Sequence, residues 1–173
     1  WGGQEIRVFQ ESQLLLERGH RVSLVCQPES FLWKKSQTIT SSSFCCYPLP
    51  MKSPANPFSI YSFLRILKKA KPDIIHTHSS IDSWLAGSTA KLLGVPVVRS
   101  RHISIPINGV FPNNLLYSWI AKKIITSGEA ISNVVLAVSG VKPENVKSVS
   151  AGVDFRRFDF KTDGSKIREE LGG

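Results

Sequence analysis

KPDIIHTHSS, residues 71–80, decides the fold: a short apolar run ends in two alternating histidines and two serines. Its β-branched content and short length predict a buried strand over residues 73–78. Before it, apolar residues recur at i, i+3, i+4 and i+7, which predicts an amphipathic helix over residues 58–70. After it, a helix is predicted from an aspartate cap over residues 82–93. The stretch is therefore one strand between two helices.

The same alternation runs through the rest of the chain. Short β-rich runs flanked by Gly or Pro predict further strands over residues 21–26, 44–47, 95–101, 123–127 and 146–151. Further helices are predicted over residues 4–18, 113–122 and 129–138. Strands that alternate with helices imply right-handed crossovers, so we predict a Rossmann-like α/β domain, a parallel sheet with helices on both faces.

The domain limits follow from the same pattern. Residues 1–160 are expected to form this domain, and residues 161–173 a linker that opens into the first helix of a second domain. Because the chain starts at Trp1, directly before a glycine pair, we expect the first strand of the sheet to lie outside this sequence. No apolar run approaches the ~18 residues that a membrane-spanning helix needs.

The net charge of +9 is scattered along the 173 residues. Basic proteins favour nucleic acids, anionic membrane surfaces or phosphate-bearing ligands. No helix-turn-helix, zinc or RNP signature accompanies the charge, so a nucleic acid is not expected as partner. One cluster lies on the predicted helix 58–71, either as an ordinary solvated face or as a docking surface for an anionic membrane: Arg65, Lys68, Lys69 and Lys71.

The three cysteines, Cys26, Cys45 and Cys46, show no disulfide framework. The adjacent pair cannot easily bridge to itself, and no CxxC motif is present for metal binding or redox work. We therefore expect reduced thiols in a cytoplasmic protein, with burial in the core as the role of Cys26.

Ligands of an open parallel sheet bind beyond the carboxyl ends of its strands. Candidate binding residues at these ends are His78, Ser79, His102, Ser127, Glu129, Gly152 and Asp154. Histidines at two such ends suit a proton-handling or sugar-binding cleft. The pair Gly2 and Gly3 precedes a helix, where backbone N–H groups can approach a phosphate or a sugar; a plain tight turn is the alternative.

The histidines divide into three predicted roles. His76 and His78 share one face of a strand, so a metal pair is geometrically permitted, but no third ligand with convincing spacing is evident, and no metal is expected. We assign His76 a packed, hydrogen-bonded role beneath the site and His78 a functional one. His102 is the stronger candidate because it stands where its strand ends, although a structural histidine remains the alternative.

Five segments, in this order, resemble the N-terminal half of family 4 glycosyltransferases, which are retaining enzymes of the GT-B fold. They are GGQEIRVFQESQLLLERGHRVSLV, KPDIIHTHSS, LLGVPVVRSRHIS, IITSGEAI and VKSVSAGVDFRRF. The resemblance implies two Rossmann-like domains facing a cleft, of which the N-terminal one mainly holds the acceptor and the C-terminal one binds the nucleotide-sugar. This chain would then be half of an enzyme, inactive alone.

The resemblance also implies roles for individual residues. His102 matches the histidine that lines the donor-sugar pocket, which makes it the candidate catalytic residue. Substrate contacts are implied for Gly2, Gly3, His78, Ser127, Glu129, Gly152 and Asp154. One departure is Ala151, which stands where the family has an asparagine.

The implied reaction transfers a sugar from a nucleotide-sugar to a glycan or lipid-linked acceptor, with retention and with no metal or other cofactor. The segments HTHSSIDSW and SRHIS most resemble the sequences of bacterial members that build cell-envelope polysaccharide or lipopolysaccharide. Such an enzyme would be cytoplasmic, either free or peripheral on the inner face of the plasma membrane. Two alternatives stay open: a sugar-nucleotide epimerase of the same architecture, and a non-catalytic α/β ligand-binding module.

Overall fold

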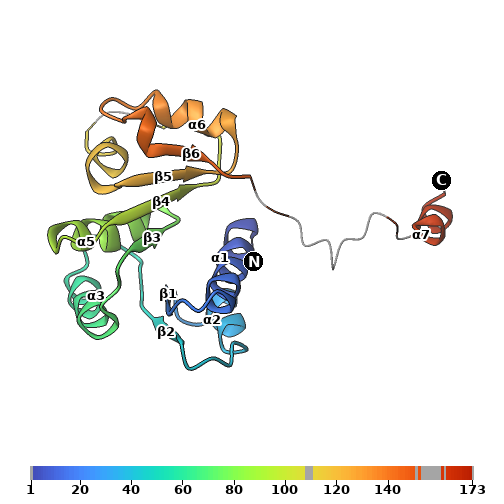
Figure 1. Cartoon of the computed structure of the whole chain (residues 1–173), viewed down its shortest axis with the longest axis horizontal. Helices are drawn as coiled ribbons and strands as arrows, with labels where there is room; N and C mark the ends of the chain where they lie inside the picture. The colour runs from blue at the N-terminus through green and yellow to red at the C-terminus, as the bar shows by residue number, and fades with distance from the viewer. Residues whose placement is uncertain (1, 108–110, 151, 153–160, 162, 173) are drawn as a thin grey trace.

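The computed structural model describes residues 2–107, 111–150, 152, 161 and 163–172. Strands and helices alternate along most of the chain, as the sequence predicts (Figure 1). The strands are β1 (Val22–Cys26), β2 (Phe44–Pro48), β3 (Ile75–Thr77), β4 (Val97–Arg101), β5 (Lys123–Thr126) and β6 (Val146–Ser148). The longer helices are α1 (Gly3–Glu17), α3 (Pro57–Ala70) and α6 (Glu129–Leu136). The shorter ones are α2 (Phe31–Ser36), α4 (Ser80–Asp82), η1 (Ser83–Gly87), α5 (Ser88–Leu92), η2 (Leu116–Ile120), η3 (Pro143–Asn145) and α7 (Ser165–Glu170).

All strand pairs in the described chain are parallel, but they form two sheets. The smaller sheet pairs β1 with β2, and the larger has the order β3-β4-β5-β6. This differs from the single sheet that we predict, because no hydrogen-bonded ladder joins β1 or β2 to the larger sheet within the described residues. Helix α1 bridges the two sheets. Its Val8 and Phe9 pack on the core of the smaller sheet, while Glu11 reaches the histidines of the larger one.

The two faces of the larger sheet have different neighbours. Val97 and Ile124 face a core that includes Val135 of α6. Because successive residues of a strand point to opposite faces, Ser100 faces the other side, where α1 lies. Helices thus cover both faces, and the predicted fold class is confirmed.

Helix α3 is the amphipathic helix predicted over residues 58–70. Its Phe63 and Leu67 are buried in a core that also holds Val25 of β1 and Ile75 of β3. This core therefore joins the two sheets. The opposite side of the helix, here called the basic face of α3, is exposed and comprises Arg65, Lys68, Lys69 and Lys71.

The helices around β4 depart from their predicted form. The helix predicted over residues 82–93 is one continuous helical run through α4, η1 and α5, with wider π-type turns in η1. The helix predicted over residues 113–122 is shortened to the π-type η2. These two elements pack closely at Gly87 of η1. A Cβ at this position would lie 2.9 Å from the Ile120 side chain of η2, which is too close for a side chain to fit without a shift. Helix α2 was not predicted; Ser30 caps it by accepting a hydrogen bond from Trp33 N at 3.1 Å.

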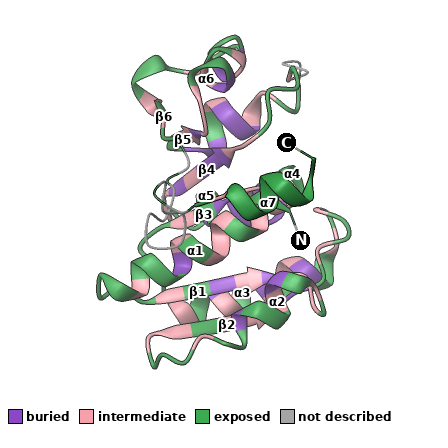
Figure 2. Cartoon of the chain, turned by 90° about the vertical axis from the view of Figure 1, so that its right-hand side faces the viewer, coloured by how far each residue is buried: buried purple, intermediate pink, exposed green. Residues whose placement is uncertain are grey.

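Helix α7 forms where the sequence predicts the helix after the linker. It is exposed along its length (Figure 2) and lies apart from both sheets (Figure 1). The domain boundary predicted near residue 160 falls outside the described residues. Within the described part of the chain, no helix has the length and apolarity that crossing a membrane requires.

Candidate functional site

Three histidines meet at the carboxyl edge of the larger sheet. His76 belongs to β3, His78 follows β3, and His102 follows β4. In their parallel register Thr77, the last residue of β3, pairs with Arg99, and β4 runs on to Arg101. The ring centroids of His76 and His78 are 4.1 Å apart, and those of His78 and His102 are 5.8 Å apart with the planes 5° from parallel. These three residues are here called the histidine cluster.

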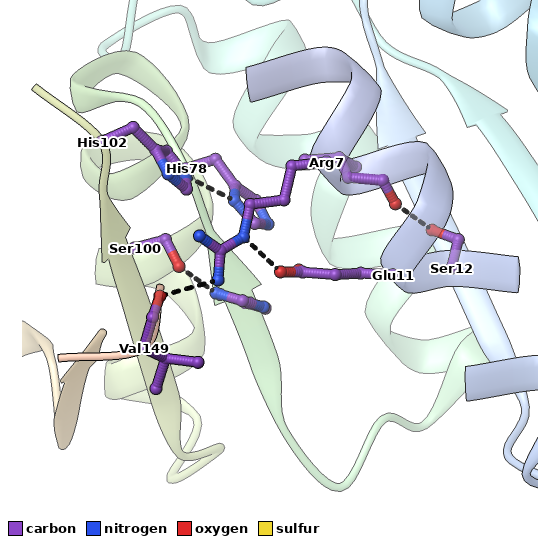
Figure 3. Close-up of polar contacts among 9 residues, drawn as sticks. Arg7, Glu11, Ser12, His78, Ser100, His102 and Val149 are labelled. Carbon is purple, nitrogen blue, oxygen red and sulfur yellow. Dashed lines mark hydrogen bonds and ion pairs between the residues drawn. The ribbon is translucent and has the colours of Figure 1, made fainter. Parts of the chain in front are cut away.

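Helix α1 adds two charged side chains to this cluster (Figure 3). Arg7 Nε donates to Glu11 Oε1 at 2.6 Å, and Arg7 Nη2 donates to the Val149 carbonyl at 3.5 Å. A spacing of four residues places Arg7 and Glu11 on one face of the helix. Glu11, His76 and His78 each offer one atom that could bind a metal ion, and these three atoms lie within 4.8 Å of one another. The helix therefore closes the cluster on one side.

His76 is only partly as predicted. Its Nε2 lies 2.7 Å from Ser100 Oγ, which confirms a hydrogen-bonded position. The expectation that it is packed away is wrong, because β3 is an edge strand in the described sheet and His76 is exposed. The expectation that these histidines lack a third potential metal ligand is also wrong. Glu11 supplies one from α1, far away in the sequence.

His78 and His102 form a close pair. Nδ1 of His78 lies 3.5 Å from Nε2 of His102, and the His78 backbone N–H donates to Asp82 Oδ2 at 3.0 Å. Burial lowers the pKa of His78 to about 2, and charge on His76, His102 and Arg7 acts in the same direction. Burial and the Arg7 charge also lower the pKa of His102. Both rings are therefore neutral at neutral pH, and each offers one donor and one acceptor nitrogen.

Ser79, a predicted substrate contact, caps the helix that follows β3. Its Oγ accepts from Asp82 N at 3.3 Å, and its backbone N–H donates to Asp82 Oδ1 at 2.8 Å. Its carbonyl accepts from Ser83 Oγ at 2.6 Å. These polar groups already hold the chain turn behind His78, and a contact from Ser79 to substrate stays a prediction.

Two arginines of β4 hold the segments that carry the histidines. Arg99 is buried and donates to the Ser79 carbonyl at 2.8 Å and to the Tyr117 hydroxyl at 3.2 Å. Arg101 donates to the same hydroxyl at 3.0 Å and to the Ile105 carbonyl. The network ties the chain after β3 to the chain after β4. The sequence pattern does not reveal this network, because the buried position of a strand arginine depends on packing against η2.

The glycine pair lies at the start of α1. The Gly2 backbone N–H donates to Glu5 Oε2 at 3.0 Å. Both glycines are exposed, and a Cβ on either Gly2 or Gly3 would meet no atom within 4 Å. The N-terminus of α1 is thus open to a ligand, and the predicted contact with phosphate or sugar stays a prediction.

The remaining predicted residues follow β5 and β6. The Ser127 backbone N–H donates to the Arg101 carbonyl at 3.3 Å, which brings it beside the start of the His102 segment. Glu129 begins α6 and is exposed. Gly152 is exposed, and Asp154 lies outside the described residues. The structure thus brings His78 and His102 together, with Ser127 on the neighbouring strand end.

A cavity of about 610 Å³ lies at the opposite edge of the same sheet. Its lining includes the first residues of β4 and β5, Val97 and Lys123, together with Trp119. Ligands of open parallel sheets bind beyond the carboxyl ends of the strands, which is the edge of the histidine cluster. We therefore place the candidate site at the histidine cluster and not at this cavity.

The chemistry of the candidate site suits a polar, anionic ligand. Neutral imidazoles can donate to and accept from sugar hydroxyls, and Arg7 can attract a phosphate. Arg7 and Glu11 are not among the site residues that the sequence predicts. Their spacing of four residues marks a helical ion pair, but it does not show which side of α1 faces the sheet.

The chain is similar in sequence to known proteins. The family profile described as Glycosyltransferase Family 4 matches residues 1–157. The chain is 27% identical over 153 residues to one subunit of the human phosphatidylinositol N-acetylglucosaminyltransferase, covering 83% of this chain and 30% of that protein. It is 30% identical over 124 residues to the Escherichia coli UDP-Gal:alpha-D-GlcNAc-diphosphoundecaprenol alpha-1,3-galactosyltransferase, covering 66% of this chain and 32% of that protein. The chain thus spans about a third of the length of these relatives.

The fold also occurs in a solved structure. Alr3699/HepE of Anabaena, in complex with UDP-glucose, superposes on this chain with a TM-score of 0.72 at 15% sequence identity. The superposition covers 99% of this chain and 47% of that chain. At this identity the likeness shows a shared fold, and this chain corresponds to about half of it.

Proposed function

We propose a sugar-transfer function for this chain, which belongs to glycosyltransferase family 4. The observation that carries the proposal is the family match over residues 1–157, a range that includes the whole histidine cluster. In the proposed reaction, a sugar moves from a nucleotide-sugar to a glycan or lipid-linked acceptor, with retention at the anomeric carbon. The proposed setting is the synthesis of cell-envelope polysaccharide or lipopolysaccharide.

The comparisons support the donor and acceptor classes. Alr3699/HepE of Anabaena was solved with UDP-glucose bound, and the E. coli relative is named for a UDP-sugar donor. That relative is also named for a diphosphoundecaprenol-linked acceptor, and the human one for phosphatidylinositol, so both names specify lipid acceptors. We propose that this chain is the acceptor-side domain. The linker after residue 160 would lead into a donor-binding domain.

The geometry suggests how the residues divide the work. His102 would contact the reacting sugar, and His78, 3.5 Å away, would hold the His102 ring in place. The open N-terminus of α1, with Gly2 and Gly3, would present backbone N–H groups to a phosphate. Preorganised N–H and cationic groups can stabilise the leaving phosphate, so the proposed reaction needs no metal.

The basic face of α3 suits a peripheral enzyme. Phe58 and Tyr61 on the same helix are 80% and 62% exposed, which places aromatic rings beside basic side chains. Aromatic rings settle at the membrane–water interface, and lysines and arginines are attracted to anionic lipid. We propose that the helix docks on the inner face of the plasma membrane, where a lipid-linked acceptor would be found.

The test compares this chain with a longer protein that includes the proposed donor-binding domain. Each is incubated with a panel of UDP-sugars and a sugar-diphosphate-polyprenol acceptor, and product is followed by mass spectrometry. We expect product from the longer protein only, and its formation should stop when that protein is heat-denatured. NMR of the product should show the same anomeric configuration as in the donor. Transfer by the 173-residue chain alone would refute the proposed division into an acceptor-side and a donor-binding domain. If the longer protein forms neither product nor free UDP, sugar transfer is refuted.

A further inference from the structure

We propose that Glu11, His76 and His78 form a binding site for a divalent transition-metal ion of the Zn²⁺ type, which would tie α1 to β3. One ligand atom from each of the three residues lies within 4.8 Å of the other two. Two imidazole nitrogens and one carboxylate oxygen are a ligand set that Zn²⁺ accepts, with a fourth position left for water.

The fold explains why these ligands converge. His76 and His78 are two residues apart on an extended chain, so their side chains leave the same face of the sheet. Helix α1 runs past that face and presents Glu11 to it. A bound ion would therefore link two elements that are far apart in the sequence.

Each candidate ligand already has an orienting partner. Arg7 Nε donates to Glu11 at 2.6 Å, and Ser100 Oγ lies 2.7 Å from Nε2 of His76. His102 lies 3.5 Å from Nδ1 of His78. In metal sites, such outer contacts fix the rotamer and the tautomer of the ligands. Here they reduce the rearrangement that binding would require.

One feature opposes the ion. The Arg7 guanidinium is paired to the Glu11 carboxylate, and its positive charge repels a cation. The remaining carboxylate oxygen and the two rings must overcome this repulsion. Glu11 is therefore the decisive ligand: without its charge, the two histidines alone would face Arg7.

The site goes beyond the proposed sugar transfer, which needs no metal, so its test uses no enzymatic activity. The purified chain is treated with a chelator, dialysed and titrated with Zn²⁺ in a calorimeter. We expect one ion per chain, and binding at least about tenfold weaker for Glu11→Gln and for His76→Ala. The matched control is His20→Ala, because His20 is exposed and is not part of the cluster. It should bind like the wild type.

A second measurement covers variants that fold poorly. Co²⁺ added to the wild-type chain should give visible absorption bands of a nitrogen- and oxygen-ligated ion, which Zn²⁺ then removes. The Zn²⁺-dependent rise in thermal midpoint should appear in wild type and His20→Ala and be absent in Glu11→Gln. Absence of Zn²⁺ binding to the wild type would overturn the proposal. So would binding that Glu11→Gln and His76→Ala leave unchanged, or that His20→Ala abolishes.

Discussion

Acid should destabilise this protein through His78. In the unfolded chain its imidazole takes up a proton near the ordinary value of 6.5, whereas burial lowers the folded pKa to about 2. Between these values the unfolded state binds more protons than the folded state, so the free energy of unfolding falls as the pH drops below 6.5. From about pH 7.5 to about pH 5, one such histidine removes about 2 kcal/mol at 25 °C.

The assay is urea denaturation followed by circular dichroism at these two pH values, with a chelator present to exclude bound metal. His78→Asn lacks the titrating ring, so its loss of stability between the two pH values should be smaller than that of wild type by about 2 kcal/mol. The matched control is the same replacement at His20, which is exposed and lies outside the histidine cluster. Equal losses for wild type and His78→Asn would contradict the conclusion that the fold holds this half-buried ring in its neutral form.

Three further predictions concern stability and docking. Arg99→Ala removes the buried cation that donates to the Ser79 carbonyl and the Tyr117 hydroxyl, to which Ser83 and Arg101 also donate, so urea denaturation should show a loss of about 1.5–3 kcal/mol. A loss within about 0.5 kcal/mol, as at ordinary surface sites, would contradict the role of this network. Phe63→Ala should lower the free energy of unfolding by about 3–5 kcal/mol because the ring is buried. Phe58 is 80% exposed, so Phe58→Ala should change it by less than about 0.5 kcal/mol, and similar losses for the two variants would show that the assigned core is wrong. Changing the four residues of the basic face of α3 to glutamine should reduce co-sedimentation with anionic vesicles at low salt, since each basic residue contributes about 1 kcal/mol to binding such a surface. Unchanged co-sedimentation would show that this is an ordinary solvated face.

The fold class was predictable because local patterns determine it. The apolar run that ends at His78 and the helical periodicity around Phe63 depend only on neighbouring residues. The helix forms as predicted, and the strand forms over the shorter range Ile75–Thr77. The division into two sheets was not predictable, because the strand pattern does not show which strands become neighbours. Helix α2 was missed because six residues are too few to produce a clear periodic signal.

The candidate site was predictable only where it lies on strand ends. His78 and His102 each follow a strand, and the rule for parallel sheets brings such residues to one edge. Arg7 and Glu11 belong to a helix whose orientation on the sheet is set by packing of distant residues, such as Phe9 on the smaller sheet. The exposure of His76 was missed for a related reason: it depends on β3 being an edge strand.

The most direct test of the account is the rate of sugar transfer by the longer protein with His102→Ala. If His102 contacts the reacting sugar, the turnover number should fall by about 10²-fold or more, the range for a positioned polar group, while the thermal midpoint stays near that of the wild type. His20→Ala is the control and should keep the wild-type rate. Near-normal turnover by a folded His102→Ala protein would contradict the assignment of the catalytic site to the histidine cluster.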